Sequence, residues 1–164
     1  MDPPLRQRLN RYKPIASTES VHFKTVKPVQ ATGASHLNLV AWDTKRWEQS
    51  AAFQLEKLAQ EGVVYCYARN DRLELNVPYE LYGVPRVYEP DFLVRLANSV
   101  TVLLEIKGKN YDNADVKHQA ARRWADAINH WGQLGCWDFL ACRNPQQLSE
   151  ELANLIAERS PLPT

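Results

Sequence analysis

The sequence predicts a mixed α/β domain in which a central mixed β-sheet is flanked by helices. Two long stretches, Thr44–Glu61 and Ala114–Trp131, repeat their apolar residues with helical periodicity. Short alternating apolar runs lie between them, separated by turn residues, and this pattern is typical of strands. The order of helix, strand block, helix, strand and helix within 164 residues fits one domain with its own hydrophobic core.

The first 35 residues are expected to form a partly disordered or extended segment, with the folded domain at 36–164. The segment begins with a stretch that is rich in proline and poor in apolar anchors. We expect short strands at Val21–Pro28 and Leu37–Trp42. The segment carries more Lys and Arg than acids, so it is either a solvated basic tail or an arm that contacts nucleic acid.

The first helix, Thr44–Glu61, has Asp43 or Thr44 as its candidate N-cap, and Gly62 is its stop signal. Four strands are expected after it, separated by clusters of Asn, Asp, Gly and Ser. These strands are Val63–Ala68, Leu73–Leu81, Val87–Leu96 and Val100–Ile106.

The second helix, Ala114–Trp131, has Asp112 as its candidate N-cap. A last strand is expected at Cys136–Cys142. Pro145 fits the first turn of a last helix that runs to about Glu158.

Composition excludes several classes of protein. The formal net charge of +1 excludes a histone-like polycation, although positive charge can still gather locally. The densest apolar run, Val100–Leu104, is far shorter than the roughly 18 residues of a membrane span, and no signal-peptide core is visible. Three cysteines without C-x-x-C spacing indicate reduced thiols, so we expect a cytoplasmic protein.

The most informative stretch runs from Asp91 to Lys107. Glu105 and Lys107 are two residues apart on an expected strand, so their side chains share a face. Asn98 lies midway between Asp91 and Glu105, and a symmetric hairpin centred on it pairs these two acids. Acids about 5 Å apart repel each other unless a cation lies between them. Lys107 is one candidate cation, and Mg²⁺, which prefers oxygen ligands, is the other.

Two charged residues fall inside the apolar stripes of the expected helices. When the first helix is projected with about 100° between successive residues, Glu48 lies on the same side as the apolar residues Ala51 and Leu55. A buried charge is costly unless it is paired or binds a metal, so Glu48 is a candidate active-site acid. Lys117 falls inside the second stripe, from which it either reaches the sheet edge or extends its ammonium group into water.

A purely structural role competes with a site at these residues. An acid and a lysine two residues apart also form ordinary cross-strand salt bridges, so Glu-x-Lys alone is a weak signal. The combination of Pro90-Asp91, the symmetric register and an acid in a helix stripe favours a metal-dependent site.

Pro90-Asp91, followed after thirteen residues by Glu105-Ile106-Lys107, resembles the signature of the PD-(D/E)xK nuclease superfamily. Further segments resemble the C-terminal endonuclease domain of type III restriction enzyme Res subunits, and the similarity covers most of residues 36–142. These segments are Trp47-Glu48-Gln49, Tyr67-Ala68-Arg69-Asn70, Val77-Pro78-Tyr79-Glu80, Tyr88-Glu89-Pro90-Asp91-Phe92, Leu104-Glu105-Ile106-Lys107-Gly108, Ala121-Arg122-Arg123-Trp124 and Gly135-Cys136-Trp137.

The resemblance implies a restriction-endonuclease-like core and Mg²⁺-dependent hydrolysis of DNA phosphodiester bonds, with Mn²⁺ able to substitute. It implies that Asp91, Glu105 and the backbone carbonyl of Ile106 ligate the metal. Lys107 would orient the attacking water or help to deprotonate it. Glu48 would hold a second metal or a metal-bound water.

The resemblance also implies partners. Larger members of the family carry a helicase motor, but this chain has no G-x-x-x-x-G-K-[ST] phosphate loop. We therefore expect a dimer or a larger restriction complex that adds motor and modification or recognition subunits. Basic residues near the acids are expected to contact DNA phosphates. They are Lys109, Lys117, Arg122 and Arg123.

Two other functions stay open. The same fold could be catalytically weak or inactive and serve in DNA binding or complex assembly. Alternatively, the substrate is RNA or branched DNA, as for a junction resolvase, because no residue pattern in the chain decides the substrate.

Overall fold

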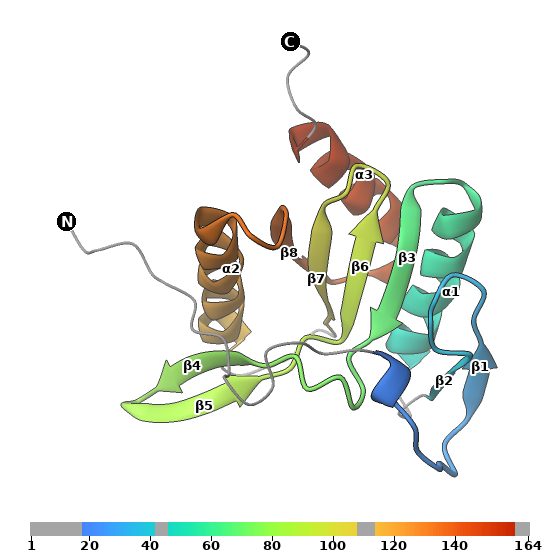
Figure 1. The fold of residues 1–164 in the computed structure, drawn as a ribbon, viewed down its shortest axis with the longest axis horizontal. Helices are drawn as coiled ribbons and strands as arrows, with labels where there is room; N and C mark the ends of the chain where they lie inside the picture. Colours follow the sequence, from blue (N-terminus) through green and yellow to red (C-terminus); the bar gives the residue numbers. More distant parts are fainter. Residues whose placement is uncertain (1–17, 42–45, 108–113, 160–164) are drawn as a thin grey trace.

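The computed structural model describes residues 18–41, 46–107 and 114–159 (Figure 1). Its centre is a four-stranded sheet, made in spatial order of β3 (Val64–Arg69), β6 (Phe92–Leu96), β7 (Thr101–Ile106) and β8 (Trp137–Cys142). The first three strands are antiparallel neighbours, whereas β7 and β8 are parallel. The predicted fold class, mixed α/β with a mixed central sheet flanked by helices, is therefore confirmed.

In the described part of the chain, three α-helices and a hairpin pack around the sheet. They are α1 (Arg46–Gln60), α2 (Ala114–Trp131), α3 (Leu148–Arg159) and the antiparallel pair of β4 (Val77–Leu81) and β5 (Val84–Tyr88). α1 and α3 pack on one face, where Leu55, Leu104 and Leu152 belong to one buried cluster. α2 and the β4–β5 hairpin lie on the opposite face, where Leu103 and Ala121 belong to a second cluster (Figure 1). We call these the α1–α3 face and the α2 face.

The alternation of side chains along β7 decides which residues reach each face. Leu104 belongs to the cluster of the α1–α3 face and Leu103 to that of the α2 face. Glu105 therefore lies on the α2 face. The backbone N–H of Lys107 still donates to the Cys142 carbonyl at 2.9 Å, so the alternation continues and Lys107 lies on that face too.

Most helix and strand positions agree with the sequence prediction. α2 has the predicted bounds, and β3, β7 and β8 begin and end within one residue of them. Gly62 ends α1 with a φ of +78°, the left-handed conformation that glycine adopts readily. The predicted N-caps Asp43, Thr44 and Asp112 lie outside the described residues. Of the helices in the described ranges, none combines the length and apolar character of a membrane span.

Two predicted strands are wrong in extent. The stretch Val87–Leu96 is not one strand, because the chain leaves the β4–β5 hairpin before β6 begins and Pro90 in this break has no N–H to donate. Only the second half of Leu73–Leu81 is a strand. Arg72 and Glu74 adopt φ angles of 63° and 58°, and these left-handed residues keep the first half from extending.

The strand predicted at Val21–Pro28 is also wrong. The first strand, β1 (Val29–Ala31), begins directly after it and pairs with β2 (Leu39–Ala41). Pro28 lacks a backbone donor, so it precedes the strand instead of joining it. A short 3-10 helix, η1 (Thr18–Ser20), begins the described chain.

The last helix begins later than predicted. Pro145 opens a short 3-10 helix, η2 (Pro145–Gln147), which is capped by Asn144 through a bond from the Gln146 N–H to Oδ1 at 3.1 Å. α3 follows directly from Leu148. The proline therefore begins the short 3-10 turn that precedes α3, and it does not begin α3 itself.

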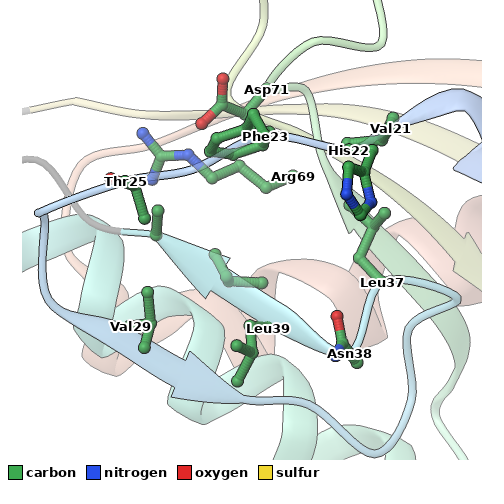
Figure 2. Close-up of a pocket in the computed structure, with 12 residues that line it drawn as sticks. Val21, His22, Phe23, Thr25, Val29, Leu37, Asn38, Leu39, Arg69 and Asp71 are labelled. Atoms are coloured by element: carbon green, nitrogen blue, oxygen red, sulfur yellow. The ribbon is translucent and has the colours of Figure 1, made fainter.

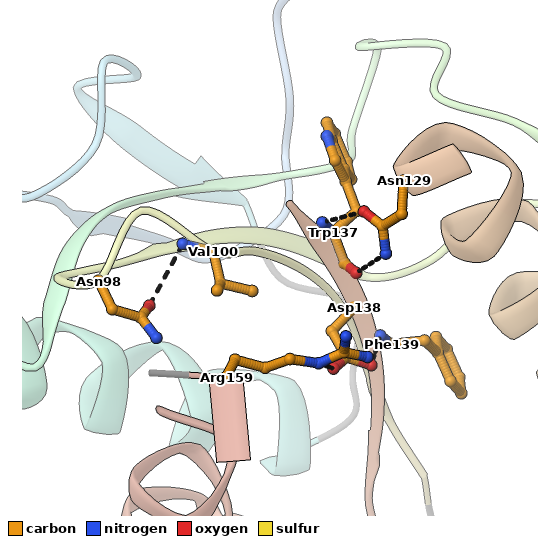
Figure 3. Close-up of polar contacts among 7 residues, drawn as sticks. All are labelled: Asn98, Val100, Asn129, Trp137, Asp138, Phe139 and Arg159. Carbon is orange, nitrogen blue, oxygen red and sulfur yellow. Dashed lines mark hydrogen bonds and ion pairs between the residues drawn. The ribbon is translucent and has the colours of Figure 1, made fainter. Parts of the chain in front are cut away.

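Polar contacts fix both C-terminal helices to β8 and shape the β6–β7 turn (Figure 3). The Asn129 side chain on α2 makes two bonds to the Trp137 backbone, at 2.8 and 2.7 Å. Arg159 on α3 donates to Asp138 at 2.9 Å. In the turn, the Val100 N–H donates to Asn98 Oδ1 at 3.2 Å. These contacts fix the strand that neighbours β7 and the hairpin that positions Asp91.

Candidate active site

The β6–β7 hairpin brings Asp91 to the end of β7. Its register pairs Phe92 with Leu104 and Leu93 with Leu103, which confirms the symmetric hairpin centred on Asn98. Asp91 directly precedes β6, and its Oδ2 accepts a bond from the Ile106 N–H at 2.7 Å. Asp91 is therefore held beside the last residues of β7, next to Glu105.

The surroundings of Glu105 destabilise its charged form. Burial and then the neighbouring Asp91 raise its pKa from 4.5 to about 8. Hydrogen bonding from Tyr88 and the charge of Lys117 oppose this rise, and Glu48 adds weakly to it. Burial and the two acids together outweigh the Tyr88 hydrogen bond and the Lys117 charge, so the pKa of Glu105 stays raised.

Tyr88 holds Glu105 in position. The tyrosine is only 4% exposed, and its Oη donates to Glu105 Oε2 at 2.7 Å. Burial and the charge of Glu105 raise the pKa of Tyr88 far above its ordinary value, so the phenol stays protonated as a donor. The Nζ atom of Lys117 lies 5.9 Å from the centre of the Tyr88 ring, close enough for a cation–π contact.

Lys107, Lys117 and Arg122 place positive charge on the same side of the sheet. The Arg122 guanidinium lies 5.4 Å from the centre of the Phe139 ring. Burial, and then the charges of Lys107, Arg122 and Arg143, lower the pKa of His118. Arg123 is exposed on α2. Lys109 lies outside the described residues.

Glu48 is buried, as its place in the helix stripe predicts, and is 6% exposed. Arg69, the last residue of β3, donates from Nη1 to Glu48 Oε2 at 2.7 Å. The acid therefore has a cation of the protein as its partner. The charge of Glu48 adds weakly to the rise of the Glu105 pKa. The ion pair with Arg69 is nevertheless a sufficient structural reason for Glu48 to be buried.

Glu56, eight residues after Glu48 and so about two turns further along α1, has a structural role. Its Oε1 accepts bonds from the backbone N–H groups of Gly33 and Ala34, at 3.0 and 3.3 Å. The Tyr67 hydroxyl donates to the same oxygen at 2.8 Å. Glu56 thus fixes the segment between β1 and β2 to α1 and β3.

Sequence reasoning missed Tyr88, Arg69, His118 and Arg143 as members of this region. Tyr88 and Arg69 are the last residues of their strands, so their contacts depend on which strand ends meet. A polar side chain at the end of an alternating run is the one sequence signal that both share.

The donor set is that of a site with two carboxylates. Within residues 18–41, 46–107 and 114–159, no group of three or more His, Cys, Asp and Glu is arranged to hold a metal ion. Comparisons with known protein families, with curated proteins and with solved structures found no match for this chain.

Proposed function

We propose that this chain is a Mg²⁺-dependent DNA endonuclease domain with a restriction-endonuclease-like core. The observation that carries the proposal is the meeting of Asp91 and Glu105 at one strand end, with Lys107 on the same face. Such an acid pair next to a lysine suits the binding of a cation and a phosphodiester. The restriction context of type III Res subunits is part of the proposal and is supported by the sequence resemblance.

The donor set fits a hard divalent cation. Mg²⁺ is commonly bound by one or two carboxylates, with waters and substrate phosphates as its other ligands. Asp91, Glu105 and the Ile106 carbonyl would supply the protein's oxygens. The raised pKa of Glu105 supports this assignment, because a cation would favour the charged form that burial and Asp91 oppose. When bound, Mg²⁺ polarises the scissile phosphate and activates water.

The chain's own residues have separate tasks in this proposal. Tyr88 holds one oxygen of Glu105 and so fixes the direction of the carboxylate. Lys107 orients the water and offsets the negative charge that develops on the phosphate. Lys117, Arg122 and Arg123 lie on α2 and would contact further phosphates of the strand.

Partners follow from charge and from the number of active sites. With a formal net charge of +1, DNA affinity depends on a few phosphate contacts, so binding should be weak and fall steeply with salt. One set of Asp91, Glu105 and Lys107 cuts one strand at a time. Efficient double-strand cleavage would therefore need a dimer or a complex with motor and recognition subunits.

The test is a nicking assay on supercoiled plasmid with Mg²⁺, with Mn²⁺ and with EDTA. We expect nicking with either metal, none with EDTA, and none from Asp91→Asn with either metal. Glu80→Gln, which changes an exposed acid on β4, is the matched control and should nick normally. Glu56 is unsuitable as that control because it makes three hydrogen bonds. Metal-independent nicking, or full activity in Asp91→Asn, would refute the proposal.

A second candidate is a nuclease-fold module that binds DNA or assembles a complex without cutting. The Glu48–Arg69 ion pair favours it, since this acid already has a cation as its partner. Absence of metal-dependent nicking by the wild-type chain would favour this module, and Glu48→Gln, which keeps the shape of the side chain and an acceptor for Arg69, tests whether Glu48 serves the metal. If Glu48 serves the metal, nicking falls, and because the buried ion pair with Arg69 is also lost, the assay is run at a temperature where the variant is still folded. An unchanged nicking rate would mean that Glu48 has only a structural role.

A further inference from the structure

A cavity of about 320 Å³ lies between the segment before β1 and the β1–β2 pair, outside the acid site. Figure 2 shows Phe23, Arg69 and Asp71 along one side and Val29 and Leu39 along the other. Its volume is at the lower end of the range of roughly 300–1,000 Å³ that is typical of small-molecule sites. The space suits a single ring system of moderate size.

The lining combines apolar walls with a few polar groups. Phe23 is 37% exposed, and Val29 and Leu39 are each 48% exposed, so apolar surface remains uncovered. Asn38 and Asp71 add an amide and a carboxylate to the rim. Apolar faces with hydrogen-bonding groups at the edge are what a nucleobase presents, and such sites bind it by stacking and edge contacts.

A second cavity, of about 370 Å³, adjoins the first and shares Phe23, Thr25 and Asp71 with it. Its lining adds three cations, Lys24, Lys27 and Arg72. The Arg72 guanidinium lies 5.4 Å from the centre of the Phe23 ring. The two cavities together thus place an aromatic ring between an apolar slot and a cationic groove.

We propose that these two cavities bind one unpaired nucleotide of a nucleic-acid strand. The base occupies the apolar slot against Phe23, and the phosphates lie along Lys24, Lys27 and Arg72. Aromatic stacking combined with a cationic track is the usual way in which proteins hold single strands. This inference rests on the proposed function, since it names the form of substrate that the acid site would receive.

Two contacts at the end of β3 connect this slot to the acid site. Arg69 lines the slot and donates to Glu48 at 2.7 Å. The next residue, Asn70, donates its backbone N–H to the Asp91 carbonyl at 2.9 Å. A strand held in the slot would therefore pass near the acids, and a base bound there would belong to a nucleotide close to the scissile bond.

The test measures binding by fluorescence anisotropy in EDTA, so that cleavage plays no part. The probes are a short oligodeoxyadenylate and an abasic oligomer of equal length that has the same phosphates and no bases. We expect the wild-type chain to bind the first at least about fivefold more tightly than the second. Phe23→Ala should abolish this preference, and Phe23→Tyr, which keeps the ring, should retain it.

Two control variants sharpen the result. Tyr65→Ala removes a tyrosine that is 76% exposed on β3 and should leave the preference intact. Lys24→Ala should weaken both probes equally and lower the salt slope by about 0.7. Equal wild-type affinity for the two probes, or a full preference in Phe23→Ala, would overturn the inference. Binding of free deoxyadenosine monophosphate, measured by calorimetry, with no binding of the oligomer would also overturn it.

The binding test is independent of the nicking test. Asp91→Asn should keep the preference for bases, because Asp91 lies outside both cavities. If the preference is present and nicking is absent, only the proposed catalysis fails. If nicking is present and the preference is absent, only the nucleotide slot fails.

Discussion

The two faces of the sheet differ in what they bury. On the α1–α3 face, α1, α3 and alternate sheet residues form one large apolar cluster that includes Leu55, Val102 and Leu148. On the α2 face the buried cluster is smaller, and one of its members, Tyr88, binds the half-buried Glu105. The α1–α3 face is largely apolar and the buried acid on α1, Glu48, is paired with Arg69, whereas the α2 face carries the pair of Asp91 and Glu105.

The difference indicates how a small domain supports an acid pair. Placing two carboxylates together in a partly buried site destabilises the fold, because their charges repel and lose water. The apolar cluster on the opposite face offsets that cost and holds β6 and β7 in register. The apolar cluster and the acid pair thus lie on opposite sides of the same two strands.

The largest effect is expected from substitutions in the acid site on the α2 face, which should remove the proposed nuclease activity and leave the fold intact. Asp91→Asn keeps an acceptor for the Ile106 N–H but removes a charge. Glu105→Gln and Lys107→Ala likewise remove charge while leaving the apolar clusters untouched. Each should abolish metal-dependent nicking and leave the circular dichroism spectrum unchanged. Wild-type nicking in any of the three would show that the site is assigned to the wrong residues.

The next largest effect is expected from a cavity in the apolar cluster of the α1–α3 face, which should lower the stability of the fold. Leu55→Ala removes a fully buried side chain and should lower the free energy of unfolding by about 2–5 kcal/mol. Phe53→Ala is the matched control on the same helix, because this residue is 63% exposed, and it should cost far less. Urea denaturation of the three chains measures the difference. Equal losses would mean that the cluster does not carry the stability.

A smaller effect tests the support of Glu105. Tyr88→Phe removes the hydroxyl that donates at 2.7 Å while keeping the buried ring. Loss of such a supporting bond typically weakens metal binding by about 10–100-fold. Calorimetric titration with Mn²⁺ should show this loss, and the melting temperature should stay close to wild type. Unchanged Mn²⁺ affinity would mean that Glu105 needs no support from Tyr88.

A pH-dependent effect follows from the raised pKa of Glu105. Because its folded pKa is about 8 and its ordinary value is 4.5, the folded chain holds a proton that the unfolded chain releases between them. Its contribution to stability is therefore full below the ordinary pKa and is lost as pH rises through about 8. In EDTA, Glu105→Gln should melt increasingly above wild type as pH rises. A constant difference between the two chains would contradict this sign.

The smallest effect concerns Lys117. This ammonium group lowers the pKa of Glu105 and lies 5.9 Å from the centre of the Tyr88 ring. Lys117→Met keeps the stem, so nicking should slow by only a few fold, and more at low pH than at high pH. Lys57→Met, on the exposed surface of α1, is the control and should change nothing. An equal slowing at every pH would point to a phosphate contact instead.

Local patterns in the sequence were sufficient for much of the fold. Helical periodicity gave both bounds of α2, and the position of Asn98 gave the register that places Asp91 at the end of β7. The break at Pro90 was missed because an apolar run hid a change of direction between two strands. Alternation describes which face a residue takes, but not where a strand leaves its sheet.

The candidate site was predictable in part for the same reason. The proximity of Asp91 to Glu105 follows from the symmetric register of the β6–β7 hairpin, and the position of the turn residue Asn98 in the sequence is enough to predict that register. The bonds of Tyr88 to Glu105 and of Arg69 to Glu48 join residues 17 and 21 positions apart and depend on tertiary packing. The nucleotide slot depends on the segment before β1, where the predicted strand was wrong.

The bond between the Asn70 N–H and the Asp91 carbonyl has a consequence for engineering. It joins the two ends of the excursion that contains the β4–β5 hairpin, so the excursion is a closed loop that leaves the sheet and returns to the same point. Lengthening such a loop costs little entropy. The exposed tip at Tyr82-Gly83 is therefore a suitable position to graft a fluorescent tag or a foreign DNA-reading module while the acids keep their places.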